Sequence, residues 1–357
     1  MDKTEQLLEE LTNAYGPPGH EEAITTIFAK QLGDIAEISY DKMGSVVAAK
    51  KGASDAPRVM VIGHCDEIGF MITEITSKGF LKFLPLGGWW GHVALGQRVM
   101  VLGRKGPIAG VIGSTPPHLL EPEDRKKVLQ IKDMYIDVGV KGKFDVKKRM
   151  GISVGDVIVP DSRFTVMANK DMYLAKALDD RYGCAVAIQV MQKLAGKKHP
   201  NTLFSVGSVQ EEVGCRGAAP AGWLVDPDVC IVLDVGIARD TPGIKGEPVE
   251  RCGNGPSILI YDAGMIPNVK LRQFVTDTAD KLKIKYHLTS MAGGITDGYW
   301  IHVSRIGVPT IVIGIPTRYI HSHNSIMSRS DYNASVRLVI ELVKKLDKKQ
   351  VKSFTQA

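Results

Sequence analysis

Four short apolar runs, each followed by a polar or glycine-rich turn, constrain the fold of this 357-residue chain. Continuous apolar runs of this length are typical of strands buried on both faces of a largely parallel sheet. The runs span residues 59–63, 203–209, 229–233 and 309–315. Apolar residues at helical spacing lie between and after these runs, over residues 178–194, 268–282 and 331–346. Strands that alternate with helices predict an α/β fold, a three-layer α/β/α sandwich around a largely parallel, mixed central sheet.

A second pattern fills the middle of the N-terminal half. Five short apolar runs are separated there by Gly, Pro and charged turns, at residues 80–84, 98–102, 108–112, 135–138 and 157–159. Short strands with almost no helix between them predict a small β-barrel. Because the α/β pattern resumes afterwards, we expect an inserted barrel domain over residues 70–165. Residues 1–69 and 166–357 then form the α/β domain.

Two predictions concern the C-terminal part of the chain. Asp331 is placed to be the N-cap of the last long helix, because a side-chain oxygen at that position accepts a hydrogen bond from the first turn. The residues after about Asp347 are polar, and a polar chain end predicts fraying.

The composition of the chain argues against a nucleic-acid-binding, secreted or membrane-spanning protein. The net charge of +6 is thinly spread, and its densest basic stretch, residues 344–352, carries no aromatic residues, which argues against nucleic-acid binding. The charged N-terminus is no signal peptide, and no apolar run approaches the roughly 18 residues of a membrane span. The five cysteines are scattered without a C-x-x-C pair, as expected of reduced thiols in the cytoplasm. Two of them, Cys65 and Cys215, lie near candidate ligands, and we interpret them as small buried apolar residues.

Acidic residues and histidines stand at successive element boundaries. The carboxyl ends of strands in an open α/β sheet meet at one edge, where ligands bind. The residues concerned are His64 and Asp66, Asp179 and Asp180, Glu211 and Glu212, Asp234, His321 and His323.

Each boundary taken alone also has a structural explanation. His64 could be a structural histidine held by a carboxylate, and Asp179–Asp180 could cap a helix. The pair Glu211–Glu212 could be solvated, although adjacent buried carboxylates repel each other unless a cation compensates. The whole set is better explained by divalent cations. Histidine and carboxylate ligands without thiolate suit zinc, cobalt or manganese, and two such ions could activate a water and polarise a carbonyl.

The chain resembles the tetrahedral aminopeptidases, also called deblocking or glutamyl aminopeptidases and, in older usage, endoglucanases. The resemblance covers essentially the whole chain and rests on four segments: residues 63–69, 176–181, 209–214 and 318–322. It implies that His64, Asp179 and Asp234 hold one metal ion. It also implies that Asp179, Glu212 and His321 hold a second ion, with a cis peptide between Asp179 and Asp180.

The same resemblance implies roles for the remaining acids and for the assembly. Glu211 would be the general base, and Asp66 would support catalysis by orienting His64. Members of this family form tetrahedral dodecamers, in which the inserted barrel helps dimers to form. Two segments depart from the usual pattern, residues 293–297 and 323–325. These departures concern the substrate pocket and the subgroup.

The sequence therefore predicts a dinuclear, metal-dependent aminopeptidase that removes N-terminal residues from short peptides. Two alternatives remain at this point. One is a glycoside hydrolase, which also uses paired carboxylates. The other is a scaffold of the same fold that has lost its activity. The sequence does not decide which N-terminal residue is preferred or which metal is physiological.

Overall fold

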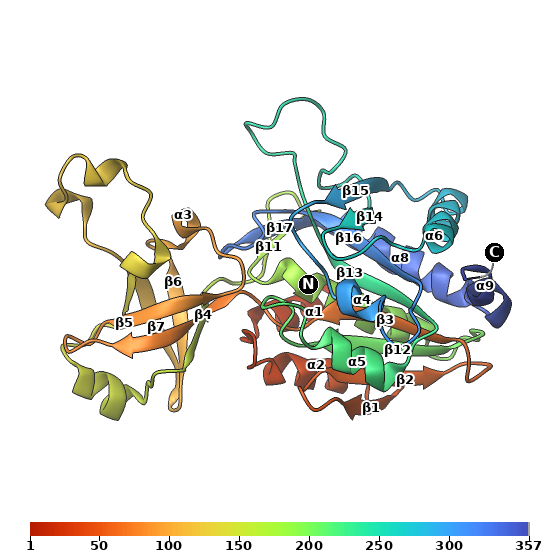
Figure 1. Cartoon of the computed structure of the whole chain (residues 1–357), viewed down its shortest axis with the longest axis horizontal. Coiled ribbons are helices and arrows are strands. Elements are labelled where there is room, and N and C mark those ends of the chain that lie inside the picture. Colours follow the sequence, from red (N-terminus) through yellow and green to blue (C-terminus); the bar gives the residue numbers. More distant parts are fainter. Residues whose placement is uncertain (356–357) are drawn as a thin grey trace.

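The computed structural model describes residues 1–355, and its centre is one 11-stranded mixed sheet (Figure 1). Nine strands follow one another across this sheet in the order β1, β2, β12, β3, β13, β16, β17, β11 and β10, while β14 pairs with β16 and β15 pairs with β14. Their bounds are β1 Glu37–Tyr40, β2 Val46–Lys51, β12 Thr202–Ser208, β3 Arg58–His64, β13 Val229–Ile237, β16 Thr310–Arg318, β17 Ser325–Ser328, β11 Met172–Ala175, β10 Thr165–Val166, β14 Ser257–Asp262 and β15 His287–Met291.

The predicted apolar runs form the parallel centre of this sheet. Strands β12, β3, β13 and β16 are neighbours and run in the same direction. The flanking strands β1, β2, β17, β11 and β10 pair antiparallel to their neighbours. The predicted α/β class with a mixed sheet is therefore confirmed.

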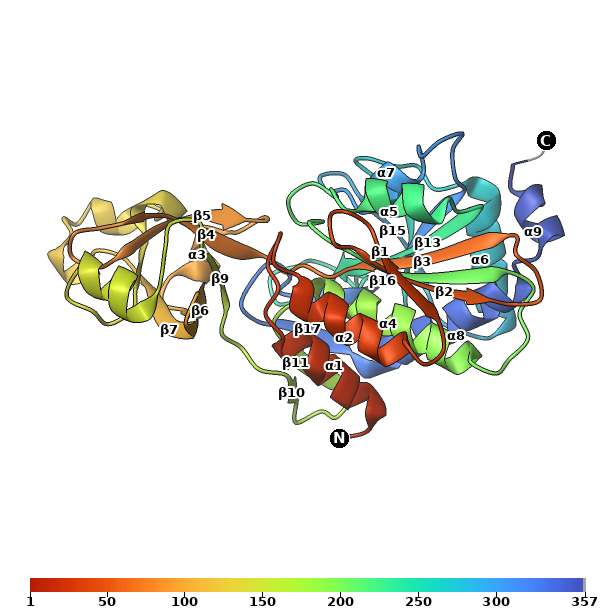
Figure 2. The same cartoon turned by 90° about the horizontal axis from the view of Figure 1, so that it is seen from below.

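Helices cover both faces of the sheet (Figure 2). One face carries α1 Lys3–Asn13, α2 Glu22–Leu32, α4 Leu178–Leu194, α6 Val269–Lys281 and α8 Arg329–Lys345. The other face carries α5 Ala218–Val225 and α7 Gly298–Ile301. Because successive side chains of a strand point to opposite faces, Val59 and Val61 of β3 join the first layer, whereas Met60 and Ile62 join the second.

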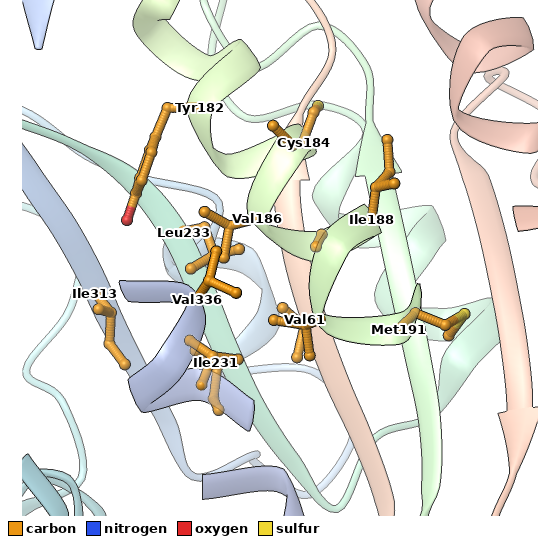
Figure 3. Packing of buried hydrophobic residues seen from close by; sticks show 14 of the residues in the cluster. Val61, Tyr182, Cys184, Val186, Ile188, Met191, Ile231, Leu233, Ile313 and Val336 are labelled. Atoms are coloured by element: carbon orange, nitrogen blue, oxygen red, sulfur yellow. The ribbon is translucent and has the colours of Figure 1, made fainter. Parts of the chain in front are cut away.

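Helix α4 is the central helix of the first layer. Its side chains Val186 and Ile188 belong to one apolar cluster with Val61, Ile231 and Leu233 of the parallel strands (Figure 3). Most of its residues are buried, because the sheet lies on one side and helices α1, α2 and α8 pack around it. This packing fixes the N-terminal end of α4 at the carboxyl edge of the parallel strands.

A closed six-stranded antiparallel barrel projects from one end of the sheet domain (Figures 1 and 2). Its strands are β4 Gly69–Ile75, β5 Leu81–Leu86, β8 Tyr135–Asp137, β7 Gly106–Gly113, β6 Arg98–Gly103 and β9 Val157–Pro160. Its loops contain α3 Gly91–Ala94 and the short turns η1 Pro117–Leu119, η2 Asp124–Lys126, η3 Ile131–Asp133 and η4 Asp145–Met150.

The sequence pattern gave five of these six barrel strands and missed β4. Pairing between β4 and β5 shifts register between Ile72 and Glu74, so the alternation of apolar and polar residues is broken within β4. The barrel has its own apolar core, which includes Phe70, Val99 and Ile136. The domain boundaries at residues 69/70 and 165/166 stay a prediction.

The C-terminal part corrects two predictions. Ser328, and not Asp331, caps α8, and the Asp331 carboxylate instead accepts hydrogen bonds from the backbone of Gly253 and Gly255, each at 2.7 Å. The stretch after Asp347 is not frayed up to residue 355. It forms α9 Lys348–Ser353, because Val351 and Phe354 are buried. The last two residues of that stretch lie outside the described range.

None of the helices within residues 1–355 has the length and apolar character needed to cross a membrane.

Candidate metal centre

The carboxyl edge of the parallel strands brings the candidate ligands together. His64 is the last residue of β3, and Asp234 lies within β13, three residues before its end. Glu211 and Glu212 follow β12, and His321 follows β16. Asp179 lies at the start of α4. Five segments that are distant in sequence thus contribute to one site.

Two groups of three ligands meet at Asp179. His64, Asp179 and Asp234 offer ligand atoms that all lie within 4.8 Å of one another, and so do Asp179, Glu212 and His321. Asp179 Oδ1 is 3.1 Å from His64 Nε2, and Asp179 Oδ2 is 3.4 Å from His321 Nε2. Glu212 Oε2 is 3.3 Å from the same His321 nitrogen. One carboxylate therefore belongs to both groups and presents a different oxygen to each histidine.

The start of α4 gives the two adjacent aspartates different partners. The Asp179–Asp180 peptide is cis, and both residues depart from helical backbone angles. Whereas Asp179 faces the two histidines, Asp180 is fully buried and accepts hydrogen bonds from the backbone N–H groups of His64 and Gly183, at 3.1 and 2.9 Å. Asp180 thereby anchors the end of β3 to the first turn of α4.

Asp66 connects the end of β3 to the turn after β12. Its carboxylate accepts hydrogen bonds from the backbone N–H groups of Glu211 and Glu212, each at 2.9 Å. Asp66 Oδ1 also lies 3.4 Å from His64 Nδ1, on the ring nitrogen opposite the one that faces Asp179. The backbone carbonyl oxygen of Asp66 lies 3.2 Å from the same ring nitrogen, so this buried residue orients one imidazole and the glutamate turn.

The barrel side contributes a contact that the sequence patterns did not predict. His321 adopts a left-handed backbone conformation, with φ of +55°, and its Nδ1 lies 2.8 Å from the carbonyl oxygen of Gly88. A Cβ atom on Gly88 would come within 2.9 Å of that ring nitrogen, so the close approach requires glycine. The only sequence signal is the pair Gly87–Gly88, directly before Trp89.

Without a cation, the buried carboxylates at the carboxyl edge of the parallel strands have too little positive charge beside them. Burial, together with the Asp179 charge, raises the pKa of Glu212 to about 8 and that of Asp234 to about 8. Burial would also raise the pKa of Asp179, but its contacts with His321 and His64 hold it below its usual value. Burial disfavours the charged form of His321, yet Asp179 and Glu212 raise its pKa to about 10.

These observations fit divalent cations. Among the described residues, Glu212 Oε1 is buried and has no hydrogen-bond partner. Carboxylates crowded in a buried site need a compensating positive charge. Imidazole and carboxylate donors are the ligand types that zinc and related ions accept.

His323 and the segment 293–297 lie outside the two ligand groups that share Asp179. His323 is not a member of any candidate ligand group in the part of the chain described, and its buried ring packs edge-on against Trp89 at 5.4 Å. Burial lowers the pKa of His323 to about 4, which favours the neutral ring. Segment 293–297 contributes Gly293 and Thr296 to the wall of a cavity beside Asp234.

That cavity has a volume of about 330 Å³. Its wall is formed largely by β13, β14, β15 and the loop after β15, and apolar side chains predominate, including Leu259, Met291 and Val312. Arg239 also reaches the wall, but its Nε lies 3.9 Å from Glu250 Oε2. Asp234, a candidate metal ligand, belongs to the cavity wall.

A buried ion cluster lies behind the site. Glu67 accepts hydrogen bonds from Lys176 Nζ at 2.6 and 2.7 Å, and Arg181 lies 3.4 Å from Glu67 Oε1. All three side chains are at most 1% exposed. The cluster ties the segment after β3 to both ends of the turn that carries Asp179. The three residues lie within segments 63–69 and 176–181, and the sequence predicts no role for them.

The comparisons with known proteins agree with this geometry. The M42 glutamyl aminopeptidase family model matches residues 44–338. The chain belongs to the M42 family.

Two solved structures and one characterised sequence illustrate the match. The lysyl aminopeptidase of Pyrococcus furiosus is 33% identical over 345 residues, which cover 96% of this chain and 97% of that protein. The TET aminopeptidase of Thaumarchaeota archaeon SCGC AB-539-E09 has a TM-score of 0.96 and 44% identity, covering 99% of this chain and 100% of that chain. The TET1 peptidase of Pyrococcus horikoshii can assemble into a tetrahedron or a large octahedral shell. It has a TM-score of 0.86 and 29% identity, covering 96% and 100% of the two chains.

Membership of the M42 family makes this chain a peptidase hydrolase of the aminopeptidase type. The predicted resemblance and the predicted enzyme class are therefore confirmed. The family match supports the aminopeptidase hypothesis over the glycoside hydrolase and scaffold alternatives.

Proposed function

We propose that this M42 protein is a two-cation aminopeptidase that removes N-terminal residues from short peptides. The observation that carries the proposal is the sharing of Asp179 between two groups of three ligands. In this arrangement His64, Asp179 and Asp234 hold one ion, and Asp179, Glu212 and His321 hold the other. Zinc and cobalt suit these donors best, and manganese suits them as well. When bound, two such ions polarise the substrate carbonyl and promote ionisation of the attacking water.

Glu211 is the proposed general base. It belongs to neither of the two Asp179 groups, yet its Oε2 lies 3.8 Å from His64 Nε2. Burial raises the pKa of Glu211 well above its usual range, so its carboxylate binds a proton more tightly than that of an exposed glutamate, and bound cations would counter part of this rise. Glu211 accepts a proton from the attacking water and delivers it to the leaving amine. Asp66 acts as a positioning residue, because it holds both the Glu211 backbone and the His64 ring.

The test is a matched pair of variants, Glu211→Gln and Glu212→Gln. We expect Glu211→Gln to retain two ions per subunit and the wild-type circular dichroism spectrum, while kcat falls by about 10²- to 10⁴-fold because proton transfer is lost. Glu212→Gln removes a proposed ligand and should lower the bound metal measured by elemental analysis. Full turnover by Glu211→Gln would refute its assignment as the base.

We further propose that the cavity beside Asp234 receives the side chain of the N-terminal residue. Its largely apolar wall and its volume of about 330 Å³ favour an uncharged side chain of medium size.

A panel of single-residue chromogenic substrates tests this preference on protein loaded with zinc, cobalt or manganese. Leucyl and methionyl substrates should give kcat/KM values about tenfold or more above glutamyl and lysyl substrates, because a charge loses hydration in an apolar pocket. A glutamyl or lysyl optimum would contradict this account of the pocket and leave the two-cation proposal intact.

The assembly and compartment are also proposals. The shells formed by Pyrococcus horikoshii TET1 support a closed homo-oligomer for this chain, with a tetrahedral dodecamer as the specific form. We assign the role of an oligomerisation domain to the barrel, residues 70–165. The five free cysteines support a cytoplasmic location, since reduced thiols are typical of that compartment.

A further inference from the structure

The thiol of Cys215 contacts the proposed base, Glu211. Cys215 Sγ donates a hydrogen bond to Glu211 Oε1 at 3.0 Å, while Glu211 Oε2 is the oxygen closer to His64. Cys215 is buried and has a left-handed backbone, with φ of +54°, and its N–H donates to the Glu211 carbonyl at 2.8 Å. The turn after β12 therefore holds the thiol against one particular carboxylate oxygen.

A second carboxylate, that of Asp297, lies close to the Cys215 thiol and the Glu211 carboxylate. Asp297 directly precedes α7 and is 2% exposed. Its Oδ2 accepts a hydrogen bond from the Ser208 hydroxyl, and its Oδ1 has no hydrogen-bond partner within residues 1–355. A buried carboxylate oxygen without a partner is costly, so this one calls for a proton donor or a cation.

These three side chains have the spacing of a cation site. Ligand atoms of Glu211, Cys215 and Asp297 all lie within 4.8 Å of one another. The group shares no residue with the two groups that meet at Asp179. It also differs from them in chemistry, because it contains a sulfur ligand and no imidazole.

We propose that Glu211, Cys215 and Asp297 form a third divalent-cation site, which takes a thiophilic ion such as zinc or cadmium. Thiolate and carboxylate together suit these ions. When the cation binds, the metal–sulfur bond replaces the S–H bond, and the proton leaves to solvent.

Occupation of this site inhibits the enzyme. A cation bound to Glu211 Oε1 neutralises the carboxylate that takes up the proton and fixes its orientation. This consequence rests on the proposed role of Glu211, whereas the existence of the site does not. Excess zinc is therefore expected to slow turnover after the two Asp179 groups have been filled.

Cadmium binding tests the site without reference to activity. The full-length apoprotein is titrated with Cd²⁺, and the ultraviolet charge-transfer absorption of cadmium thiolate is followed while elemental analysis gives the stoichiometry. Because the other two groups contain no sulfur, the band reports only on the third ion. We expect three ions per subunit and a band that saturates with the third equivalent.

Three variants test whether the cadmium absorption band arises from Cys215. Cys215→Ser preserves the size of the side chain and its hydrogen bond, and it should lose the band and bind two ions. Asp297→Asn should keep the thiol but weaken binding of the third ion by about tenfold or more, because loss of a ligand carboxylate costs at least as much as loss of an outer-shell one. Cys252→Ser, at the partly exposed cysteine, should keep both the band and the stoichiometry. Absence of the band in the wild type, or its persistence in Cys215→Ser, overturns the site.

Zinc inhibition tests the link to catalysis, with each variant compared with its own uninhibited rate. Cys215→Ser should need about tenfold or more zinc for half-inhibition. In another outcome, the wild type shows the cadmium band but zinc inhibits the wild type and Cys215→Ser equally. This result would retain the third site and refute the role of Glu211. Zinc inhibition of a wild type that shows no cadmium band would refute the site alone.

Discussion

Glu67 is buried between the cationic side chains of Lys176 and Arg181. It therefore supports the arrangement of the carboxyl edge of the parallel strands. Its carboxylate contacts Lys176 and Arg181 and also accepts a hydrogen bond from the backbone of Gly16 at 3.1 Å. Lys176 in turn donates to the carbonyl oxygen of Ala14 at 2.9 Å. The cluster therefore fixes the N-terminal segment, the loop after β3 and the approach to α4 in one arrangement.

Glu67→Gln should destabilise the protein by about 3–5 kcal/mol, because it leaves buried cations without their counter-charge. The measurement is the free energy of unfolding from chemical denaturation at neutral pH. Glu123→Gln is the matched control, since Glu123 forms an ion pair of 2.9 Å with Lys126 but is 79% exposed. The control should change stability by about 0.5 kcal/mol or less. Equal effects of the two substitutions would contradict the account of the buried cluster.

Position in the sequence was enough to predict much of the candidate site at residue level. His64 ends β3, Glu212 follows β12 and Asp234 directly follows an apolar run within β13, and the carboxyl ends of such strands share an edge whatever the loops do. Gly88 and Asp297 were not predictable in the same way. Their contacts depend on where the barrel and the segment before α7 pack, and no local pattern specifies that packing.

At the scale of elements, the sequence patterns predicted the buried strands and helix α4 well. Predictions failed where one contact outweighed local composition. Helix α9 forms in a polar stretch because Phe354 packs against Phe274, with ring centroids 5.6 Å apart. Ser328 takes the cap of α8 because Asp331 binds the turn at Gly253–Gly255. Such tertiary contacts override propensity and cannot be seen in a short window of sequence.

The first turn of α4 tolerates little change, because β3 and Asp180 lie directly against it. A Cβ atom on Gly183 would lie 2.2 Å from Asp180 Oδ2. Gly183→Ala should therefore displace Asp180, cost about 1–3 kcal/mol and reduce the bound metal, since Asp180 also holds the His64 backbone. Thermal unfolding and elemental analysis measure the two effects. Gly293→Ala is the control, because a Cβ atom there meets nothing within 4 Å. A Gly183→Ala protein with normal stability and metal content would refute this role of the turn.

At the scale of the molecule, the barrel has two surfaces with different roles. Its loop at Gly88 and Trp89 reaches the candidate metal centre, where it contacts His321 and His323. Elsewhere it exposes large apolar side chains, with Leu119 77% and Phe144 72% accessible in the single chain. Single exposed apolar side chains are common on protein surfaces, so a role of these two in subunit contact is part of the proposed assembly. In the proposed closed shell, a second copy of the chain covers them.

The double variant Leu119→Glu, Phe144→Glu tests this surface. Charged side chains there should prevent burial between subunits, so the assembly should shift to smaller species in size-exclusion chromatography with light scattering. The monomer should stay folded, because neither residue belongs to the barrel core. Ile306→Glu is the control, since Ile306 is fully exposed on the sheet domain and far from the barrel in sequence. A dodecamer that persists in the double variant but dissociates in Ile306→Glu would move the subunit contact from the barrel to the sheet domain.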